Sequence, residues 1–250
     1  MTIPIELIDD FQAGEVVAFC GAGLSVASGL PTGGAVARDL AALLPDFDGD
    51  PQNLTEVATV YEATRGRNAL IRHLVRAGSR AAVPNGAHHA LAQLPLAGVV
   101  TTNWDRLIED SLSVSSRAHS VIVHDTEAVF THAGDISVLK LHGSVERPDS
   151  IIVTERDYHR VFLRSAVQVE ILSYYFATRT ILFLGYSLAD SDLRRLLYLT
   201  GERLGPLRRR AYAVQVSPRR SQSDFWRSEQ VEIIDAEAEQ FLLEMTTHAE

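Results

Sequence analysis

A glycine-rich turn at the end of an apolar run can bind phosphate, and this chain has one near its start. The apolar run Val16–Cys20 is followed by Gly-Ala-Gly-x-Ser-x-x-Ser-Gly-x-Pro at residues 21–31. Because glycine has no side chain, backbone N–H groups in such a turn can approach a phosphate closely. The segment predicts the mouth of a nucleotide-binding α/β sheet, with candidate residues Gly21, Ala22, Gly23, Ser25 and Gly29.

The spacing of these glycines differs from the dinucleotide-binding motif of dehydrogenases. That motif is Gly-x-Gly-x-x-Gly, with an acidic residue about 20 positions later at a strand end. Here the third glycine, Gly29, comes too late, and Asp39 falls inside a predicted helix. The segment is therefore a poor match to a dehydrogenase.

A second polar segment, Thr101-Thr102-Asn103-Trp104-Asp105, follows the apolar residues 98–100. Asn103 or Asp105 could cap the helix that comes next, since both residue types accept N–H bonds at a helix start. Capping alone does not require polar side chains at both positions behind a buried strand. The segment is a candidate part of a site, and simple capping is the alternative.

A histidine, His142, comes directly after the apolar run Val138–Leu141 and is followed by Gly143. This placement puts the imidazole at the edge of the predicted sheet. A lone histidine is more often structural than catalytic, so the order of the surrounding motifs has to decide its role. His88 and His89 stand together elsewhere and are interpreted as a structural or surface pair, because their spacing does not suggest a metal site.

The fourth segment, Gly-Tyr-Ser-Leu-Ala-Asp-Ser-Asp at residues 185–192, follows the run Ile181–Leu184. Gly185 permits close backbone approach, and the Ser187 hydroxyl can bond a phosphate or a ribose. Asp190 or Asp192 can cap the next helix. In open α/β sheets ligands bind at the carboxyl ends of the strands, which is where all four segments are expected to lie.

Seven apolar runs rich in β-branched residues predict strands, and several are continuous, as expected of parallel strands covered on both faces. They are Val16–Cys20, Val99–Thr102, Val121–Val123, Val138–Leu141, Ile181–Leu184, Ala211–Val216 and Val231–Ile234. Helical spacing of apolar residues lies between them, over Gly34–Leu44, Asn68–Ala77, Trp104–Leu112, Ser165–Ala177 and Asp192–Leu204. This order predicts an α/β fold with a Rossmann-like, doubly wound parallel sheet.

The connection between the first two predicted strands is unusually long. A simple crossover needs only about a dozen residues, so a helical insert is expected at roughly 35–96, within a single domain spanning residues 1–250. The stretch Asp235–Glu250 reads as a last helix with a frayed end.

Composition narrows the class of protein. The formal net charge of −9 argues against a nucleic-acid binder. The basic cluster Arg208–Arg210, with Arg219 and Arg220 nearby, is interpreted as a solvated loop, and contact with a polyanion or partner is the alternative. The single Cys20 excludes an internal disulfide and a cysteine-rich zinc site. Neither a membrane span nor a signal peptide is evident, so a cytoplasmic protein is expected.

Taken in order, the four segments resemble the signatures of the sirtuin (SIR2) superfamily, whose members bind NAD. Residues 21–31 resemble its first signature, and residues 101–105 resemble Thr-Gln-Asn-x-Asp with Thr102 in place of glutamine. His142-Gly143 matches the catalytic His-Gly, and Gly185-x-Ser187 resembles the strand-end Gly-x-Ser motif. The version Gly-Tyr-Ser-Leu-x-Asp looks closer to the SIR2-like domains of bacterial antiphage systems than to deacylases.

The resemblance implies a role for each candidate residue toward NAD⁺ as substrate. His142 would engage the nicotinamide-ribose hydroxyls as a base, Asn103 would hold the ribose or orient water, and Asp105 would bind the nicotinamide carboxamide. No metal is required. The residues implied to hold the rest of the dinucleotide are Gly21, Ala22, Gly23, Ser25, Gly29, Thr102, Gly185 and Ser187.

Departures from the deacylase pattern favour hydrolysis. Protein-deacylating sirtuins carry a zinc module and continue past the proline into a segment with Phe and Arg. Here Pro31 is followed by Thr32-Gly33-Gly34, and the cysteines of a zinc module are absent from the sequence. A site without the shielding Phe is better suited to admitting water, which implies cleavage of NAD⁺ to nicotinamide and ADP-ribose.

The leading hypothesis is thus an NAD⁺ hydrolase of bacterial antiphage defence. The alternatives are a metal-free protein deacylase or ADP-ribosyltransferase, and a non-catalytic module that binds NAD or ADP-ribose. Because unregulated NAD⁺ hydrolysis would be toxic to the host, the resemblance also implies a homo-oligomer, a regulatory partner such as an ATPase or an Argonaute-like protein, or both. No direct contact with nucleic acid or membrane is expected.

Overall fold

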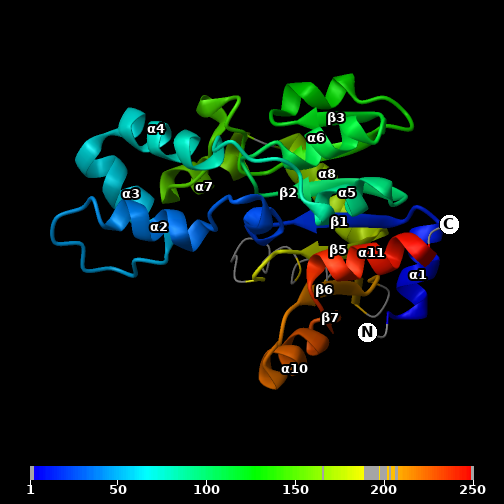
Figure 1. Cartoon of the computed structure of the whole chain (residues 1–250). Coiled ribbons are helices and arrows are strands. Elements are labelled where there is room, and N and C mark those ends of the chain that lie inside the picture. The colour runs from blue at the N-terminus through cyan, green and yellow to red at the C-terminus, as the bar shows by residue number, and fades with distance from the viewer. Residues whose placement is uncertain are drawn as a thin grey trace.

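The computed structural model describes residues 3–164, 166–188, 197, 202, 204–205 and 208–248. Within them, seven parallel strands form one sheet in the order β3-β4-β2-β1-β5-β6-β7 (Figure 1). Each strand lies on one of the seven predicted apolar runs, and the predicted parallel α/β fold is confirmed. The strands are β1 Val16–Cys20, β2 Leu96–Thr101, β3 His119–Ile122, β4 Ile136–Lys140, β5 Thr180–Leu184, β6 Ala211–Gln215 and β7 Val231–Asp235.

The carboxyl ends of the central strands meet at one edge of the sheet. Cys20 of β1 pairs with Thr101 of β2 and with Leu184 of β5, and Thr101 pairs with Lys140 of β4. From β1 the chain continues to β2 on one side, and β5 lies on the other side. This reversal is the topological switch point at which open α/β sheets bind ligands.

Helices cover both faces of the sheet, and β1 shows why. Its residues 16, 18 and 20 belong to one apolar cluster and its residues 17 and 19 to another, so successive side chains point into opposite layers. One layer contains α1 Ile5–Gln12, α5 Gly86–Gln93, α6 Leu107–Val114 and α11 Ala238–His248. The opposite layer contains α8 Ala166–Thr178 and α10 Arg220–Ser228 (Figure 1).

A third apolar cluster lies beyond the end of the sheet. It joins α2 Gly33–Ala41, α3 Leu54–Arg65 and α4 Arg67–Gly78 to Ile151 and Val153, which precede α7 Glu155–Arg164. Figure 1 shows these helices gathered beside the carboxyl ends of the strands. Helices α2 to α4, over residues 33–78, thus build this helical module, whereas α5, also in the expected insert of roughly 35–96, packs on the sheet. Short 3-10 helices lie at η1 Ala22–Ser28, η2 Asp125–Phe130 and η3 Pro148–Ser150.

One residue of the basic cluster, Arg208, differs from the expected solvated loop, whereas the other four arginines are exposed as expected. Arg208 is buried, and its guanidinium donates to the carbonyl of Leu197 at 2.7 Å and to Gln230 Oε1 at 3.1 Å. Burial lowers the pKa of this guanidinium. Arg210 forms an ion pair with Glu232 of the neighbouring strand. These arginines therefore stabilise the β5–β7 side of the fold, because each has a local partner.

Two expectations cannot be compared with the structure. The predicted helix Asp192–Leu204 and the capping residues Asp190 and Asp192 lie outside the described residues, apart from isolated positions.

Helices α1 and α10 were not expected from the sequence. Among the described residues, no helix has both the length and the apolar character needed to cross a membrane.

Candidate functional site

The turn after β2 is built by its own polar side chains. The Thr101 hydroxyl donates to the Cys20 carbonyl at 3.0 Å, and the Thr102 N–H donates to the same carbonyl at 3.3 Å. The Asn103 N–H in turn donates to the Thr101 hydroxyl oxygen at 3.0 Å. These bonds tie the end of β2 to the end of β1, and they direct residues 103–105 toward the switch point.

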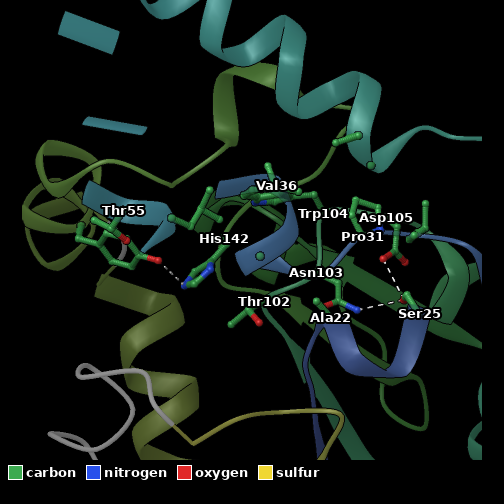
Figure 2. A pocket seen from close by; sticks show the side chains of 16 residues that line it. Ala22, Ser25, Pro31, Val36, Thr55, Thr102, Asn103, Trp104, Asp105 and His142 are labelled. Carbon is green, nitrogen blue, oxygen red and sulfur yellow. Dashed lines mark hydrogen bonds between the residues drawn. The ribbon is translucent and has the colours of Figure 1, made fainter. Parts of the chain in front are cut away.

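Ser25, on η1, connects the two polar residues of that turn. Its hydroxyl donates to Asp105 Oδ2 at 3.0 Å and accepts a bond from Asn103 Nδ2 at 3.2 Å, as Figure 2 shows. Asn103 Nδ2 also donates to the Gly21 carbonyl at 3.2 Å. The sequence interpretation expected Ser25 to face a diphosphate, whereas its hydroxyl is buried and is already bonded to two side chains.

Asn103 leaves one strong acceptor without a partner. The residue is 95 % buried, and its Oδ1 has no hydrogen-bond partner among the described residues. Nδ2 is held by the two bonds above, so the orientation of the amide is set. A buried amide oxygen without a partner is unfavourable unless a ligand or water donates to it. Asn103 is therefore equipped to accept a hydrogen bond from a bound hydroxyl or water.

Asp105 both caps a helix and belongs to the site. Its Oδ1 accepts a bond from the Leu107 N–H at 3.0 Å, at the start of α6, while Oδ2 accepts from Ser25. The capping alternative thus holds for this residue, but Asn103 bonds to Gly21 and Ser25 and caps nothing. Each carboxylate oxygen can accept a further bond, so capping leaves Asp105 able to contact a ligand.

His142 lies two residues after the end of β4 and faces the same space. Its ring packs edge-on against Tyr158, with centroids 5.3 Å apart, and its Nε2 lies 3.5 Å from the Tyr158 hydroxyl (Figure 2). Gly143 behind it has φ +83°, and a Cβ there would lie 2.3 Å from the Ser150 carbonyl oxygen. Glycine is required here because the chain turns tightly against η3.

These side chains line one small cavity of about 180 Å³, which we call the His142 cavity. The sheet edge and η1 contribute Ala22, Ser25, Thr102, Asn103, Asp105 and His142. The helical module contributes the other wall with Val36, Leu54, Thr55 and Ala77, and α7 adds Tyr158. The three predicted catalytic residues are thus brought together, while the contribution of the module was missed.

A larger cavity of about 830 Å³ lies on the β5–β6 side, and we call it the Ser187 cavity. It is lined by the predicted residues Gly23, Gly185 and Ser187, together with Gln215 and Glu237, which were not predicted. Ala22, Gly33, Leu54 and Thr102 line both cavities. An elongated ligand that occupied both would therefore cross between them at these four residues.

The glycines of the first signature bring two main chains together. The N–H of Gly21 donates to the Leu184 carbonyl and that of Gly23 donates to the Gly185 carbonyl, both at 2.9 Å. A Cβ on Gly23 would lie 2.7 Å from that carbonyl oxygen. These two N–H groups are thus engaged by the end of β5, which differs from the expectation that they face a phosphate. Gly29, with φ +85°, ends η1 and lines neither cavity.

Two further groups lie immediately behind the site. Cys20 is fully buried, and burial raises the pKa of its thiol, as expected of an inert core cysteine. His88 is also buried, and its Nε2 lies 3.5 Å from the Ser25 hydroxyl. Burial lowers its pKa to about 4. The described residues contain no group of three His, Cys, Asp or Glu side chains placed to hold a metal ion.

Comparison with known proteins agrees with this geometry. A family model described as a SIR2-like domain matches residues 97–234. NAD(+) hydrolase ThsA of Cytobacillus dafuensis is 30 % identical over 193 residues, which are 77 % of this chain and 39 % of that protein. The ThsA of Acinetobacter baumannii is 31 % identical over 194 residues, with 76 % and 40 % covered. The chain thus spans about two fifths of the length of these relatives.

Solved structures share the fold. A Sir2 homologue in complex with NAD aligns with a TM-score of 0.57 and 17 % identity, covering 99 % of this chain and 94 % of that one. A Sir2 homologue in complex with 2′-O-acetyl ADP ribose aligns with a TM-score of 0.60 and 16 % identity, covering 99 % and 96 %. The family match covers more than half of the chain and includes three of the four signatures, and the chain belongs to the SIR2-like domain family.

Proposed function

We propose that this chain hydrolyses NAD⁺ to nicotinamide and ADP-ribose. The observation that carries the proposal is the His142 cavity, where side chains from the ends of three strands meet around the unpartnered Asn103 Oδ1. The relatives named NAD(+) hydrolase support the same reaction, since they are about 30 % identical over most of this chain.

The two cavities suit the two ends of a dinucleotide. The nicotinamide ribose occupies the His142 cavity, and the adenosine occupies the Ser187 cavity, whose volume of about 830 Å³ lies within the usual range of ligand sites of about 300–1,000 Å³. The diphosphate then crosses from one cavity to the other at the residues that line both, which are Ala22, Gly33, Leu54 and Thr102. Gly185 and Ser187 lie on the far side of this crossing.

The reaction breaks the bond between C1′ of the ribose and the ring nitrogen of nicotinamide. The bonding electron pair leaves with nicotinamide, and positive charge develops on the ribose before water adds at C1′. A site for this step must orient the ribose, stabilise positive charge and admit water. The buried Asp105 carboxylate supplies negative charge beside the cavity.

Asn103 and His142 act on the ribose and on the attacking water. Asn103 Oδ1 accepts a hydrogen bond from a ribose hydroxyl or from the water, which satisfies its buried acceptor. His142 acts as the base that takes up a proton from a ribose hydroxyl, because imidazole is the side chain that most often performs this role in enzymes. Asp105 accepts a bond from the nicotinamide carboxamide.

The test is to incubate purified protein with NAD⁺ and to separate nicotinamide and ADP-ribose by chromatography. We expect His142→Ala and Asn103→Ala to abolish turnover while leaving the circular dichroism spectrum unchanged. His89→Ala is the matched control, because this histidine lines neither cavity. Wild-type activity in either cavity variant would refute the assignment.

The same assay separates the alternatives. A deacylase or ADP-ribosyltransferase consumes NAD⁺ only when an acyl-lysine peptide or an acceptor protein is added. A binding module shows no turnover, yet NAD⁺ or ADP-ribose titrated into it gives a calorimetric signal. Free ADP-ribose formed from NAD⁺ and water alone supports hydrolysis.

We further propose a role in bacterial defence, with activity controlled by homo-oligomerisation or by a regulatory partner protein. The name of one relative supports the role: defense-associated sirtuin 2 of Bacillus subtilis is 28 % identical over 116 residues, which are 45 % of this chain and 11 % of that protein. Light scattering after size-exclusion chromatography tests the assembly. A monomer at high concentration with full constitutive activity would contradict regulation by assembly.

A further inference from the structure

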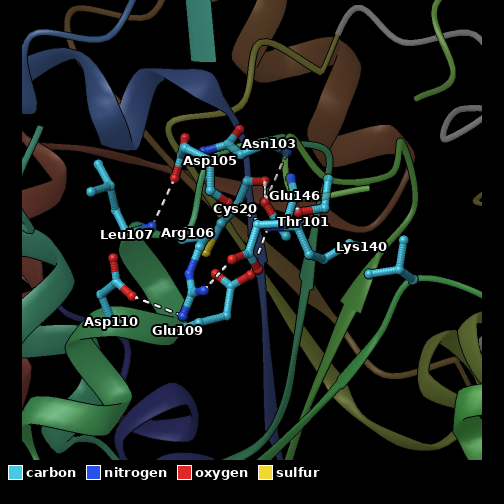
Figure 3. A network of polar contacts seen from close by, with 12 residues as sticks. Cys20, Thr101, Asn103, Asp105, Arg106, Leu107, Glu109, Asp110, Lys140 and Glu146 are labelled. Atoms are coloured by element: carbon cyan, nitrogen blue, oxygen red, sulfur yellow. Dashed lines mark hydrogen bonds and ion pairs between the residues drawn. The ribbon is translucent and has the colours of Figure 1, made fainter. Parts of the chain in front are cut away.

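A buried ion pair lies directly beneath the residues of the His142 cavity. Lys140 is the last residue of β4, two positions before His142, and its Nζ lies 2.7 Å from Glu109 Oε1 of α6. The two side chains are 1 % and 6 % exposed. The Lys140 ammonium also donates a hydrogen bond to the main-chain carbonyl of Asp105 (Figure 3).

Stability alone does not account for this pair. Removing a lysine and a glutamate from water is unfavourable, and well-packed apolar residues of similar volume often give equal or greater stability. The pair is also imperfect, because Glu109 Oε2 is buried without a hydrogen-bond partner among the described residues. What the pair provides is a charge-assisted hydrogen bond to one peptide of the site.

The Asp105 peptide belongs to residues 103–105, which must be aligned with His142 in the site. Asp105 bonds to Ser25 and to the Leu107 N–H, so the orientation of its peptide sets the direction of its carboxylate. Lys140 belongs to the strand that delivers His142. The ammonium therefore couples the position of residues 103–105 to the position of His142.

We propose that Lys140, with its charge neutralised by Glu109, is a positioning residue for the NAD⁺-cleaving site. The inference rests on the proposed function. Lys140 touches no substrate: it holds the Asp105 peptide so that the carboxylate and Asn103 face the cavity. Glu109 is needed because an uncompensated ammonium beneath the site would oppose the positive charge that develops on the ribose.

The double variant Lys140→Met/Glu109→Leu separates positioning from stability. It keeps apolar volume and leaves no buried charge, so we expect a melting temperature within a few degrees of the wild type. Misplacement of a catalytic group by about 1 Å can lower the rate about 100-fold, so we expect kcat to fall at least about tenfold, with a smaller change in KM. Lys140→Met alone leaves Glu109 unpaired and lowers the melting temperature as well.

A second measurement does not depend on turnover. Hydrogen exchange of the Leu107 amide, which donates to the Asp105 carboxylate, reports how firmly that residue is held. We expect faster exchange of the peptide spanning residues 102–110 in the double variant, with unchanged exchange of β1. Arg106→Gln is the control, because it removes only the exposed ion pairs of Arg106 with Asp110 and Glu146.

The outcomes are distinguishable. If the wild type does not cleave NAD⁺, the proposed function fails, while the exchange measurement still tests the positioning role. A double variant with wild-type kcat, or with wild-type exchange over residues 102–110, would overturn the inference. An equal loss of kcat in Arg106→Gln would also overturn the inference, because any change at the start of α6 would then lower kcat.

Discussion

His88 carries a pH dependence that is large enough to measure. The imidazole is 1 % exposed, and burial is the main cause that lowers its pKa to about 4, although nearby Asp105 acts in the opposite direction. An exposed histidine in the unfolded chain has a pKa near ~6.5. Between these values the unfolded chain binds a proton that the folded chain does not, so stability is lost as the pH falls from about 6.5 to about 4.

The size of the effect follows from the two pKa values. A change from about 6.5 to about 4 corresponds to about 3 kcal/mol, at about 1.4 kcal/mol per pH unit. By pH 5 the unfolded state is mostly protonated at this site and the folded state is mostly neutral. About 2 kcal/mol of the free energy of unfolding should therefore be lost between pH 7.5 and pH 5 through this residue alone.

Urea unfolding followed by circular dichroism at pH 7.5 and pH 5 measures this loss. Other groups also titrate over the range, so the informative quantity is the difference between the wild type and His88→Gln, which cannot be protonated. We expect the variant to be less stable at pH 7.5 but to lose about 2 kcal/mol less on acidification. His89→Gln, on the same helix, keeps His88 and should keep the full loss. Equal losses in the wild type and His88→Gln would refute the reasoning.

Two further predictions concern positions around the site. Gly143→Ala should destabilise the protein by at least about 2 kcal/mol, because it adds a clash with the Ser150 carbonyl to the strain of a positive φ. Gly29→Ala, at a similar φ of +85° with nothing within 4 Å of its Cβ, is the control for thermal melts and should lose less stability. Cys20 should not react with Ellman's reagent in the native protein, because the thiol is buried and held protonated. In urea the same thiol should react and release one equivalent of the coloured thiolate. Rapid labelling of the native protein would contradict this prediction and show that this part of the core opens.

Much of the fold could be predicted from the sequence, for a physical reason visible in β1. Parallel strands with both faces covered are continuously apolar, so runs such as Val16–Cys20 stand out from half-buried helices. Which strands are neighbours was not predictable, because the hydrophobic pattern of a strand does not specify its partner. The same limit applies to the helical module, where Val36 and Leu54 line the cavity. The periodicity of Gly34–Leu44 indicated a buried face that includes Val36 but not what that face covers, and Leu54 lies in none of the predicted helices.

The site was predictable where strand ends supply polar side chains. Asn103, Asp105 and His142 converge because Cys20, Thr101 and Lys140 are in register at one edge of the sheet. The use of Gly21 and Gly23 was not predictable, because a sequence cannot tell whether a glycine admits a ligand or another main chain. The position of His88 could also have been predicted from the sequence, although it was not. Asn85-x-x-His88 has the spacing of an N-cap and N3 pair, which places the imidazole at the start of α5.

The Ser25 hydroxyl shows how closely the two halves of the site depend on each other. A hydroxyl has one donor and two acceptor positions. The donor is used by Asp105 and one acceptor by Asn103. His88 lies beside the same hydroxyl, with Nε2 3.5 Å from it, and His88 Nδ1 lies 2.9 Å from Asn85 Oδ1 and 3.3 Å from the Asn85 nitrogen. Because its single donor is used, a direct bond from this hydroxyl to a diphosphate would require the bond to Asp105 to be released. Ser25 therefore joins η1 to the turn after β2 through its bonds to Asn103 and Asp105.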